Sequence, residues 1–213
     1  YSSAASDVYK RQVYIVMTGR DVTVMLPLHL QNEVIHPAGQ IHAGFGGAEG
    51  DRTAFISAAS KALQAAAEAG VQRIFVRMAF QPDGADLIEN CELYRFVKQN
   101  EVMRDGSWGA EFFEALAPDC ETDIVVSHNR VNAFFATGLE KMLSDLGCDH
   151  LVLLGVATHS VVEHTARHAA DLGLKVTVVE DACSAYPRER HIASLSAIEN
   201  LVTVIPSREL ALG

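Results

Sequence analysis

The stretch "LLGVATHSVVEHTARHAADLG" (Leu153–Gly173) decides the fold of this 213-residue chain, because it joins two kinds of regular structure at one sharp turn. Its first residues form a continuous apolar run, which is typical of a strand covered on both faces. The four residues Ser160–Glu163 have the spacing of a helix capping box, and Gly173 predicts a helix end. The stretch therefore predicts a buried strand, a tight turn and a helix. We call this unit the elbow.

Similar apolar runs recur along the chain and predict a six-stranded sheet. The predicted strands are Val22–Leu28, Arg73–Met78, Asp123–Ser127, His150–Val156, Lys175–Glu180 and Leu201–Ile205. Helical patterns lie between most of them: Asp51–Ala69, a helix that the capping box Thr137–Glu140 begins and Gly147 ends, the elbow helix, and Arg190–Asn200. Strands that alternate with helices indicate a mostly parallel sheet with right-handed crossovers. We predict one α/β domain with three layers, α/β/α.

The first twelve residues do not share these patterns. "YSSAASDVYKRQ" has no starting methionine and no useful periodicity, and it resembles translated adapter sequence. We therefore predict that residues 1–12 are a non-native or disordered leader and that residues 13–213 form the single domain.

Composition and charge narrow the class of partner. The chain has 17 Lys and Arg against 27 Asp and Glu, a formal charge of −10, and no basic stripe. Nucleic acid and membranes are therefore not expected as partners, and no apolar run has the length of a membrane span. The four cysteines are widely spaced, without a C-x-x-C pair, which favours the cytoplasm and argues against a disulfide framework. We expect a small-molecule partner.

Histidines follow three of the predicted strands. The segments after those strands are "HLQNEVIHP" (residues 29–37), "HNRVNAFF" (128–135) and "ATHSVVEH" (157–164). Because the carboxyl ends of parallel strands meet at one edge of a sheet, His29, His128 and His159 are expected near one another. Histidine titrates near neutrality and can move protons or bind metal.

The elbow adds a second chemical feature. If Ser160 caps its helix, the amides of Val161 and Val162 are among the unpaired donors of the first turn. These amides lie at the positive end of a helix dipole, which suits an oxyanion or a carboxylate.

Four motifs in order resemble the isochorismatase-like hydrolase superfamily, which includes cysteine hydrolases. "LHLQNEVIHP" resembles its D-x-Q-N-D-F, "VVSHNRVNAF" its V-V-x-K-x-R-x-S-A-F, and "GVATHSVVEHTARHAADLG" its G-V-A-T-N-x-C-V-x-x-T-A-R-D-A. "VVEDACSA" matches the next strand and turn, so the resemblance covers nearly all of Val22 to Ile205. It implies a homo-oligomer, either a dimer or a tetramer.

The resemblance also implies positions for the catalytic groups. The Asp, Lys and Cys of typical members fall on His29, His128 and Val161, so all three are replaced. A cis peptide near Val156–Ala157 and an oxyanion hole made by the amides of Ala157 and Val161 are implied as well. The D-x-H zinc motif of nicotinamidases is absent after the second strand.

Three functions remain open on this basis. The first is a hydrolase without the cysteine, in which His29 and His128 move protons around a water to cleave an enol ether, an ester or a C–N bond. The second is an enzyme with a divalent metal bound by His29, His128 and His159. The third is an inactive small-molecule-binding homologue whose pocket is filled by Val161 and phenylalanines.

Further residues are predicted around this site. We expect Asn32, Arg130, Phe134 and His159 to line the substrate pocket, with no metal in the first of the three functions. The long insertion Gln81–Asp119, which carries Trp108, is expected to be a lid or a contact with a second subunit.

Overall fold

A six-stranded parallel sheet forms the centre of the molecule, as the sequence predicts. The computed structural model describes residues 22–46 and 49–212, so the predicted leader at residues 1–12 lies outside the described residues. The strands are β1 (Thr23–Leu28), β2 (Gln72–Met78), β3 (Ile124–His128), β4 (His150–Val156), β5 (Lys175–Ser184) and β6 (Thr203–Ile205). Their order is β3-β2-β1-β4-β5-β6, and every pair is parallel.

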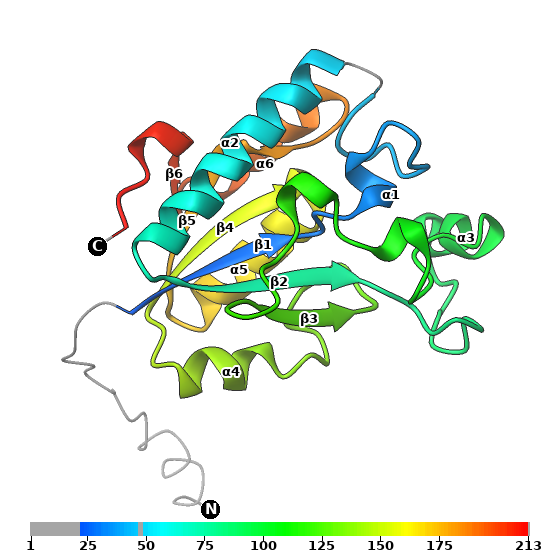
Figure 1. Cartoon of the computed structure of the whole chain (residues 1–213), viewed down its shortest axis with the longest axis horizontal. Coiled ribbons are helices and arrows are strands. Elements are labelled where there is room, and N and C mark those ends of the chain that lie inside the picture. Colours follow the sequence, from blue (N-terminus) through cyan, green and yellow to red (C-terminus); the bar gives the residue numbers. More distant parts are fainter. Residues whose placement is uncertain (1–21, 47–48, 213) are drawn as a thin grey trace, which may run out of the picture.

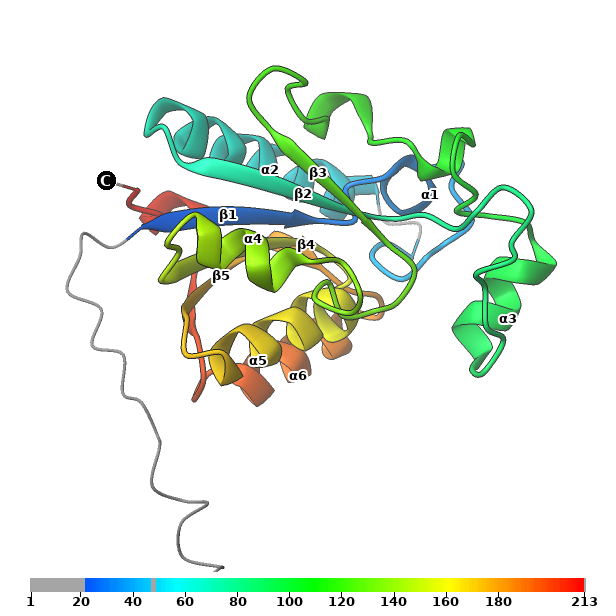
Figure 2. The same ribbon diagram turned by 90° about the horizontal axis from the view of Figure 1, so that it is seen from below.

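Helices cover both faces of this sheet. They are α1 (Asn32–Ile35), α2 (Glu49–Glu68), α3 (Glu92–Gln99), α4 (Leu139–Asp145), α5 (Glu163–Asp171) and α6 (Arg188–Ile198). Short 3-10 helices occupy Trp108–Ala110, Glu114–Leu116 and Ser207–Glu209. Figure 2 shows α2 on one face of the sheet and α4, α5 and α6 on the other. The result is the predicted α/β/α arrangement in three layers.

The strands are buried because their side chains are apolar on both faces. In β1 and β4 every residue after the first is buried, so the continuous apolar runs correspond to central strands. The predicted apolar face of α2 packs onto the sheet through Phe55, Ala59 and Leu63, all buried. Figure 1 shows the arrowheads of β1, β2 and β3 on the side where α1 and α3 lie. Loops at these carboxyl ends are where ligands of open parallel sheets bind.

The predicted capping boxes do not form. The elbow helix begins earlier, as a π-helix over Thr158–Val162 that follows Ala157, and its N-cap has no side-chain hydrogen bond. The Glu163 carboxylate accepts hydrogen bonds from Arg167 and Ser194 instead, since a guanidinium is a stronger partner than a backbone amide. In α4 the N-cap is Gly138, and Thr137 Oγ1 accepts from Leu139 N–H at 3.3 Å.

The long insertion has structure of its own and is fixed to the sheet. It contains α3 and two of the 3-10 helices. The buried Gln31 donates from Nε2 to the carbonyl oxygens of Met78 and Ala110, both at 2.8 Å, and accepts from Met78 N–H at 2.8 Å. One fully bonded amide therefore holds the insertion to the ends of β1 and β2.

A close approach of β1 and β4 at Gly155 gives a test of this packing. Gly155 has φ +130°, and a Cβ there would lie 2.0 Å from the carbonyl oxygen of Leu28. Gly155→Ala is therefore expected to lower the free energy of unfolding by several times the cost of Gly147→Ala. Gly147 has φ +68° with no atom within 4 Å of its Cβ position, so that substitution costs only about 1–2 kcal/mol. Urea denaturation of both variants measures the difference. Equal losses would contradict the contact.

Candidate functional site

Two buried histidines meet at the carboxyl edge of the sheet. His29 follows β1 and His128 ends β3, and β2 lies between these strands in the sheet. Their Nε2 atoms are 2.5 Å apart, and their ring centroids are 4.8 Å apart. The side chains are 7% and 4% exposed. The structure thus brings together the two residues at the positions that the resemblance assigns to an Asp and a Lys.

The hydrogen bonds around the pair fix which nitrogen carries each proton. His128 Nδ1 lies 3.3 Å from the carbonyl oxygen of Asn132, which can only accept, so Nδ1–H is the donor. The Nε2 of a neutral His128 then has a lone pair and accepts from His29 Nε2–H. The proton positions follow from this network. His29 Nδ1 therefore carries a lone pair, and no described residue donates a hydrogen bond to it.

Burial keeps both rings neutral. It lowers the pKa of His29 well below 6.5, and the charge that His128 would carry lowers it further. Burial also lowers the pKa of His128 to about 4, against a smaller raising effect of its hydrogen bond to Asn132. A pair of neutral imidazoles can share one proton without an uncompensated buried charge.

At the elbow, the side chain of Val161 is buried and only the main chain carries polar groups. Val161 is fully buried and Ala157 is 4% exposed, and the peptide bond between Val156 and Ala157 is cis, as the resemblance implies. The carbonyl of Ala157 accepts from the amides of Ser160 and Val162 at 3.1 and 3.4 Å. The position of the family cysteine therefore holds an apolar side chain with no reactive atom.

The residues predicted to line the substrate pocket are dispersed in the structure. Asn32 lines a surface hollow of about 760 Å³ and donates to the carbonyl oxygen of Trp108. Phe134 is buried and stacks on His168 at 4.4 Å. The Arg130 guanidinium lies 5.4 Å from the ring centroid of Tyr94 in α3, and it has no ion pair among the side chains that the structure describes.

His159 is separate from this group and is surrounded by charges. Burial is the main cause that lowers its pKa, and Arg190 in α6 lowers it further, while Glu163 raises it. Its Nδ1 is buried without a hydrogen-bond partner. In residues 22–46 and 49–212 no three His, Cys, Asp or Glu side chains gather closely enough to hold a metal ion. The predicted metal set of His29, His128 and His159 is therefore not assembled, because His159 faces α6.

Two hollows of the described chain do not include the histidine pair in their lining. The hollow beside Asn32 and a second one of about 320 Å³ at the end of β5 are lined by other residues. Cys183 in β5 is no substitute for the missing nucleophile, since burial raises its pKa to about 12. The chemistry available at the pair is proton transfer by neutral imidazole.

Comparison with known proteins agrees with the fold. The model of the isochorismatase domain family matches residues 23–209. Ureidoacrylate amidohydrolase RutB of Acinetobacter baylyi is 36% identical over 102 residues, 47% of this chain and 41% of that protein. The isochorismatase family protein YecD of Escherichia coli O157:H7 is 38% identical over 89 residues, 42% of this chain and 47% of that protein. The match thus spans less than half of either relative.

A solved structure extends the comparison to the whole fold. The cysteine hydrolase from Pseudomonas syringae pv. phaseolicola superposes with a TM-score of 0.78 at 25% identity, covering 88% of this chain and 90% of that one. The parallel sheet with helices on both faces and the family match define an isochorismatase-like α/β domain. The chain belongs to the isochorismatase family, within the isochorismatase-like hydrolase superfamily.

Two contributors to the site were not predicted from the sequence. The carbonyl of Asn132 orients His128, and main-chain acceptors leave no signature in a sequence. Gln31 fixes the loop that carries His29, and its place in the Q-N pair of the first motif is the signal that points to it.

The lowered pKa values predict a loss of stability in acid. The folded-state pKa of His128 lies below its ordinary value of 6.5, so the unfolded chain binds a proton first as the pH falls. Stability is full above about pH 6.5 and declines towards pH 4, by about 3 kcal/mol for His128 alone. Urea denaturation at several pH values measures this decline. His128→Asn should make it smaller, whereas His164→Asn, at an exposed position, should not. An equal decline in both variants would contradict the assignment.

Proposed function

We propose that this chain is a hydrolase of the isochorismatase family that uses water, not a cysteine, as its nucleophile. One observation carries the proposal: the 2.5 Å contact between His29 and His128, which leaves Nδ1 of His29 as the available base. The substrate is a small molecule with a labile ester bond, because base-activated water attacks a carbonyl carbon.

The mechanism for an ester follows from the positions of the protons. His29 Nδ1 takes a proton from water, and the resulting hydroxide attacks the carbonyl carbon to form a tetrahedral oxyanion. Amides of the elbow, at Ala157 and Val161, stabilise that oxyanion. When the intermediate collapses, the C–O bond breaks and His29 returns the proton to the leaving alcohol. His128 holds the tautomer and stabilises the transient positive charge.

The expected rate enhancements favour cleavage of a labile bond over cleavage of an amide. A positioned general base contributes about 10²–10⁴-fold, and an oxyanion donor about 10²–10³-fold. Loss of the nucleophile of a triad costs around 10⁶-fold, which leaves too little rate for an unactivated amide. The amide chemistry in the name of RutB is therefore not proposed for this chain.

A specific observation favours a second candidate, a homologue that binds a small molecule without turnover. His29 and His128 are only 7% and 4% exposed, and Val161 occupies the position of the nucleophile with no exposed surface. The hydrolase proposal requires the segment around the pair to open when substrate binds.

Substitutions at the pair separate the two candidates. Assays use a series of short-chain 4-nitrophenyl esters. His29→Asn should lower kcat by about 10²–10⁴-fold, because the general base is lost. His128→Asn, which keeps an acceptor for His29 Nε2–H, should retain more activity than His128→Leu. His164→Asn is the matched control. Undiminished turnover in His29→Asn would contradict the mechanism, and wild-type binding of these compounds without turnover would favour the second candidate.

Thiol alkylation tests the absence of covalent catalysis. Iodoacetamide should modify the exposed Cys91 and Cys120 without lowering turnover, because the buried thiols of Cys148 and Cys183 have raised pKa values, about 11 and 12. Mass spectrometry locates the modified residues. Inactivation that follows alkylation would overturn the water mechanism.

A further inference from the structure

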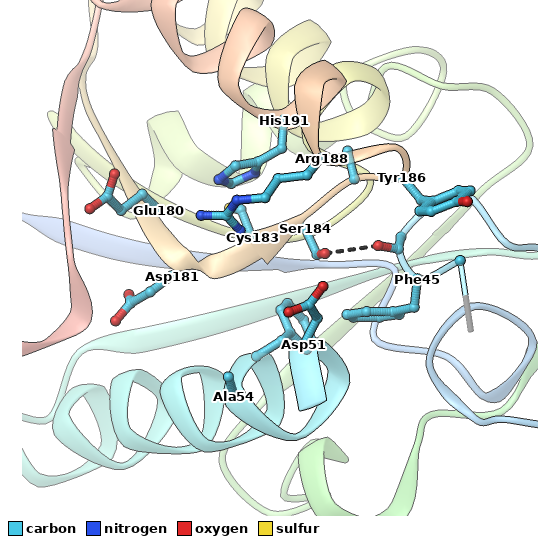
Figure 3. A pocket seen from close by; sticks show the side chains of 14 residues that line it. Phe45, Asp51, Ala54, Glu180, Asp181, Cys183, Ser184, Tyr186, Arg188 and His191 are labelled. Carbon is cyan, nitrogen blue, oxygen red and sulfur yellow. Dashed lines mark hydrogen bonds between the residues drawn. The ribbon is translucent and has the colours of Figure 1, made fainter. Parts of the chain in front are cut away.

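A cavity of about 320 Å³ lies at the carboxyl end of β5, away from the histidine pair. It is lined by residues 44–46, by the first turns of α2 and by the first turn of α6, together with Cys183 and Ser184 of β5 (Figure 3). Neither His29, His128 nor Val161 lines it. Its volume is in the range of sites that take small molecules.

The wall beside the aromatic residues is held in place by hydrogen bonds and packing. Ser184 Oγ donates to the carbonyl oxygen of Gly44 at 2.8 Å, and Tyr186 N–H donates to that of Ala43 at 2.8 Å. The ring of Phe45 packs edge-on against Phe55, with centroids 5.3 Å apart. The loop is therefore tied to the end of β5, and the cavity is formed before any ligand arrives.

Charged side chains of both signs line this small space. They are Asp51, Glu180, Asp181 and Arg188 (Figure 3). Asp181 is already satisfied, since its carboxylate accepts from Ser207 N–H at 2.6 Å and from Ser207 Oγ at 2.8 Å. In the part of the chain that the structure describes, the other three side chains make no ion pair and no side-chain hydrogen bond. Two carboxylates and one guanidinium are thus available to bind a ligand.

A largely buried histidine also lines this space. His191 is only 9% exposed and lines the cavity. Its Nδ1 is hydrogen-bonded to Thr158 Oγ1 at 2.8 Å, and its Nε2 has no partner among the described residues. Burial, followed by the charge of Arg188, lowers the pKa of His191, so the ring is neutral and offers a hydrogen bond without adding charge.

We propose that the cavity binds a basic α-amino acid, a small molecule with one carboxylate and two cationic groups. Arg188 takes the carboxylate, because a guanidinium matches its two oxygens. Asp51 and Glu180 take the two cations. Phe45 and Tyr186 contact the aliphatic stem, and His191 Nε2 provides a further hydrogen bond. The ligand's charge of +1 is opposite in sign to the net charge of the lining, which holds one guanidinium and three carboxylates, one of them hydrogen-bonded to Ser207.

Other small ligands fit this set of charges less well. A dicarboxylate would bring a second negative charge against Asp51 and Glu180. A diamine would leave Arg188 without a partner, and a neutral amino acid would leave one carboxylate unpaired. The predicted order of affinity is therefore L-lysine first, then L-norleucine and 1,5-diaminopentane, and glutarate last.

Calorimetric titration of the full chain with these four compounds tests the proposal. L-lysine should bind saturably, and at least about tenfold more tightly than L-norleucine or 1,5-diaminopentane. The absence of saturable lysine binding up to about 10 mM would overturn the proposal, as would equal binding of lysine and norleucine.

Variants then test which group takes which end of the ligand. Arg188→Gln should weaken lysine binding about tenfold or more and should not weaken binding of 1,5-diaminopentane, because the substitution removes a positive charge that repels a diamine. Glu180→Gln should weaken lysine more than norleucine. Glu189→Gln and Arg190→Gln, neighbouring positions outside the cavity lining, are the matched controls. Wild-type lysine affinity in Arg188→Gln would overturn the assignment. Hydrolysis at the histidine pair is measured separately, so failure of one proposal leaves the other testable.

Discussion

The hydrogen bond between His29 and His128 connects two strands that are not neighbours. β1 and β3 lie on either side of β2, so the bond spans the carboxyl edge of the sheet above β2. It requires both loops to turn inward, and His29 does so with φ +53°, a conformation that few residues adopt. The inward turn of His29 is supported from below by Gln31, whose amide is bonded to β2 and to the insertion. The edge of the sheet, the first loop and the insertion thus meet at one contact.

That contact also determines what chemistry remains possible. An Asp and a Lys at these positions, as the resemblance implies for typical members, would form an ion pair, and an ion pair survives burial only when it is well bonded. Two neutral imidazoles avoid the desolvation cost altogether. They cannot supply a strong acid at neutral pH, but they can supply a base whose tautomer is fixed. With Val161 in place of a thiol, the site suits water activation for labile bonds and not covalent catalysis.

The second cavity has the opposite electrostatic character. Asp51 and Arg188 are exposed there, and its selectivity rests on charge complementarity. The two regions are linked through Thr158, which belongs to the elbow and is bonded to His191. One domain therefore has a buried site for proton transfer and a solvent-exposed site for ligand binding. In the described residues no helix is long and apolar enough to cross a membrane.

The sequence by itself determined the six strands, their parallel arrangement and the histidines at their ends. Continuous apolar runs and strand–helix alternation are local patterns, and burial on both faces is what they require. The four motifs were likewise sufficient for the family. Only the tertiary structure decided that His29 and His128 are bonded to each other, that His159 faces α6, and that Glu163 bonds Arg167 instead of capping a helix. The cavity at β5 combines Phe45 and Asp51 with Arg188 from a distant segment. These contacts form between residues that only folding brings together, and the side chains then compete for the same hydrogen-bond partners. A local sequence pattern does not contain that information.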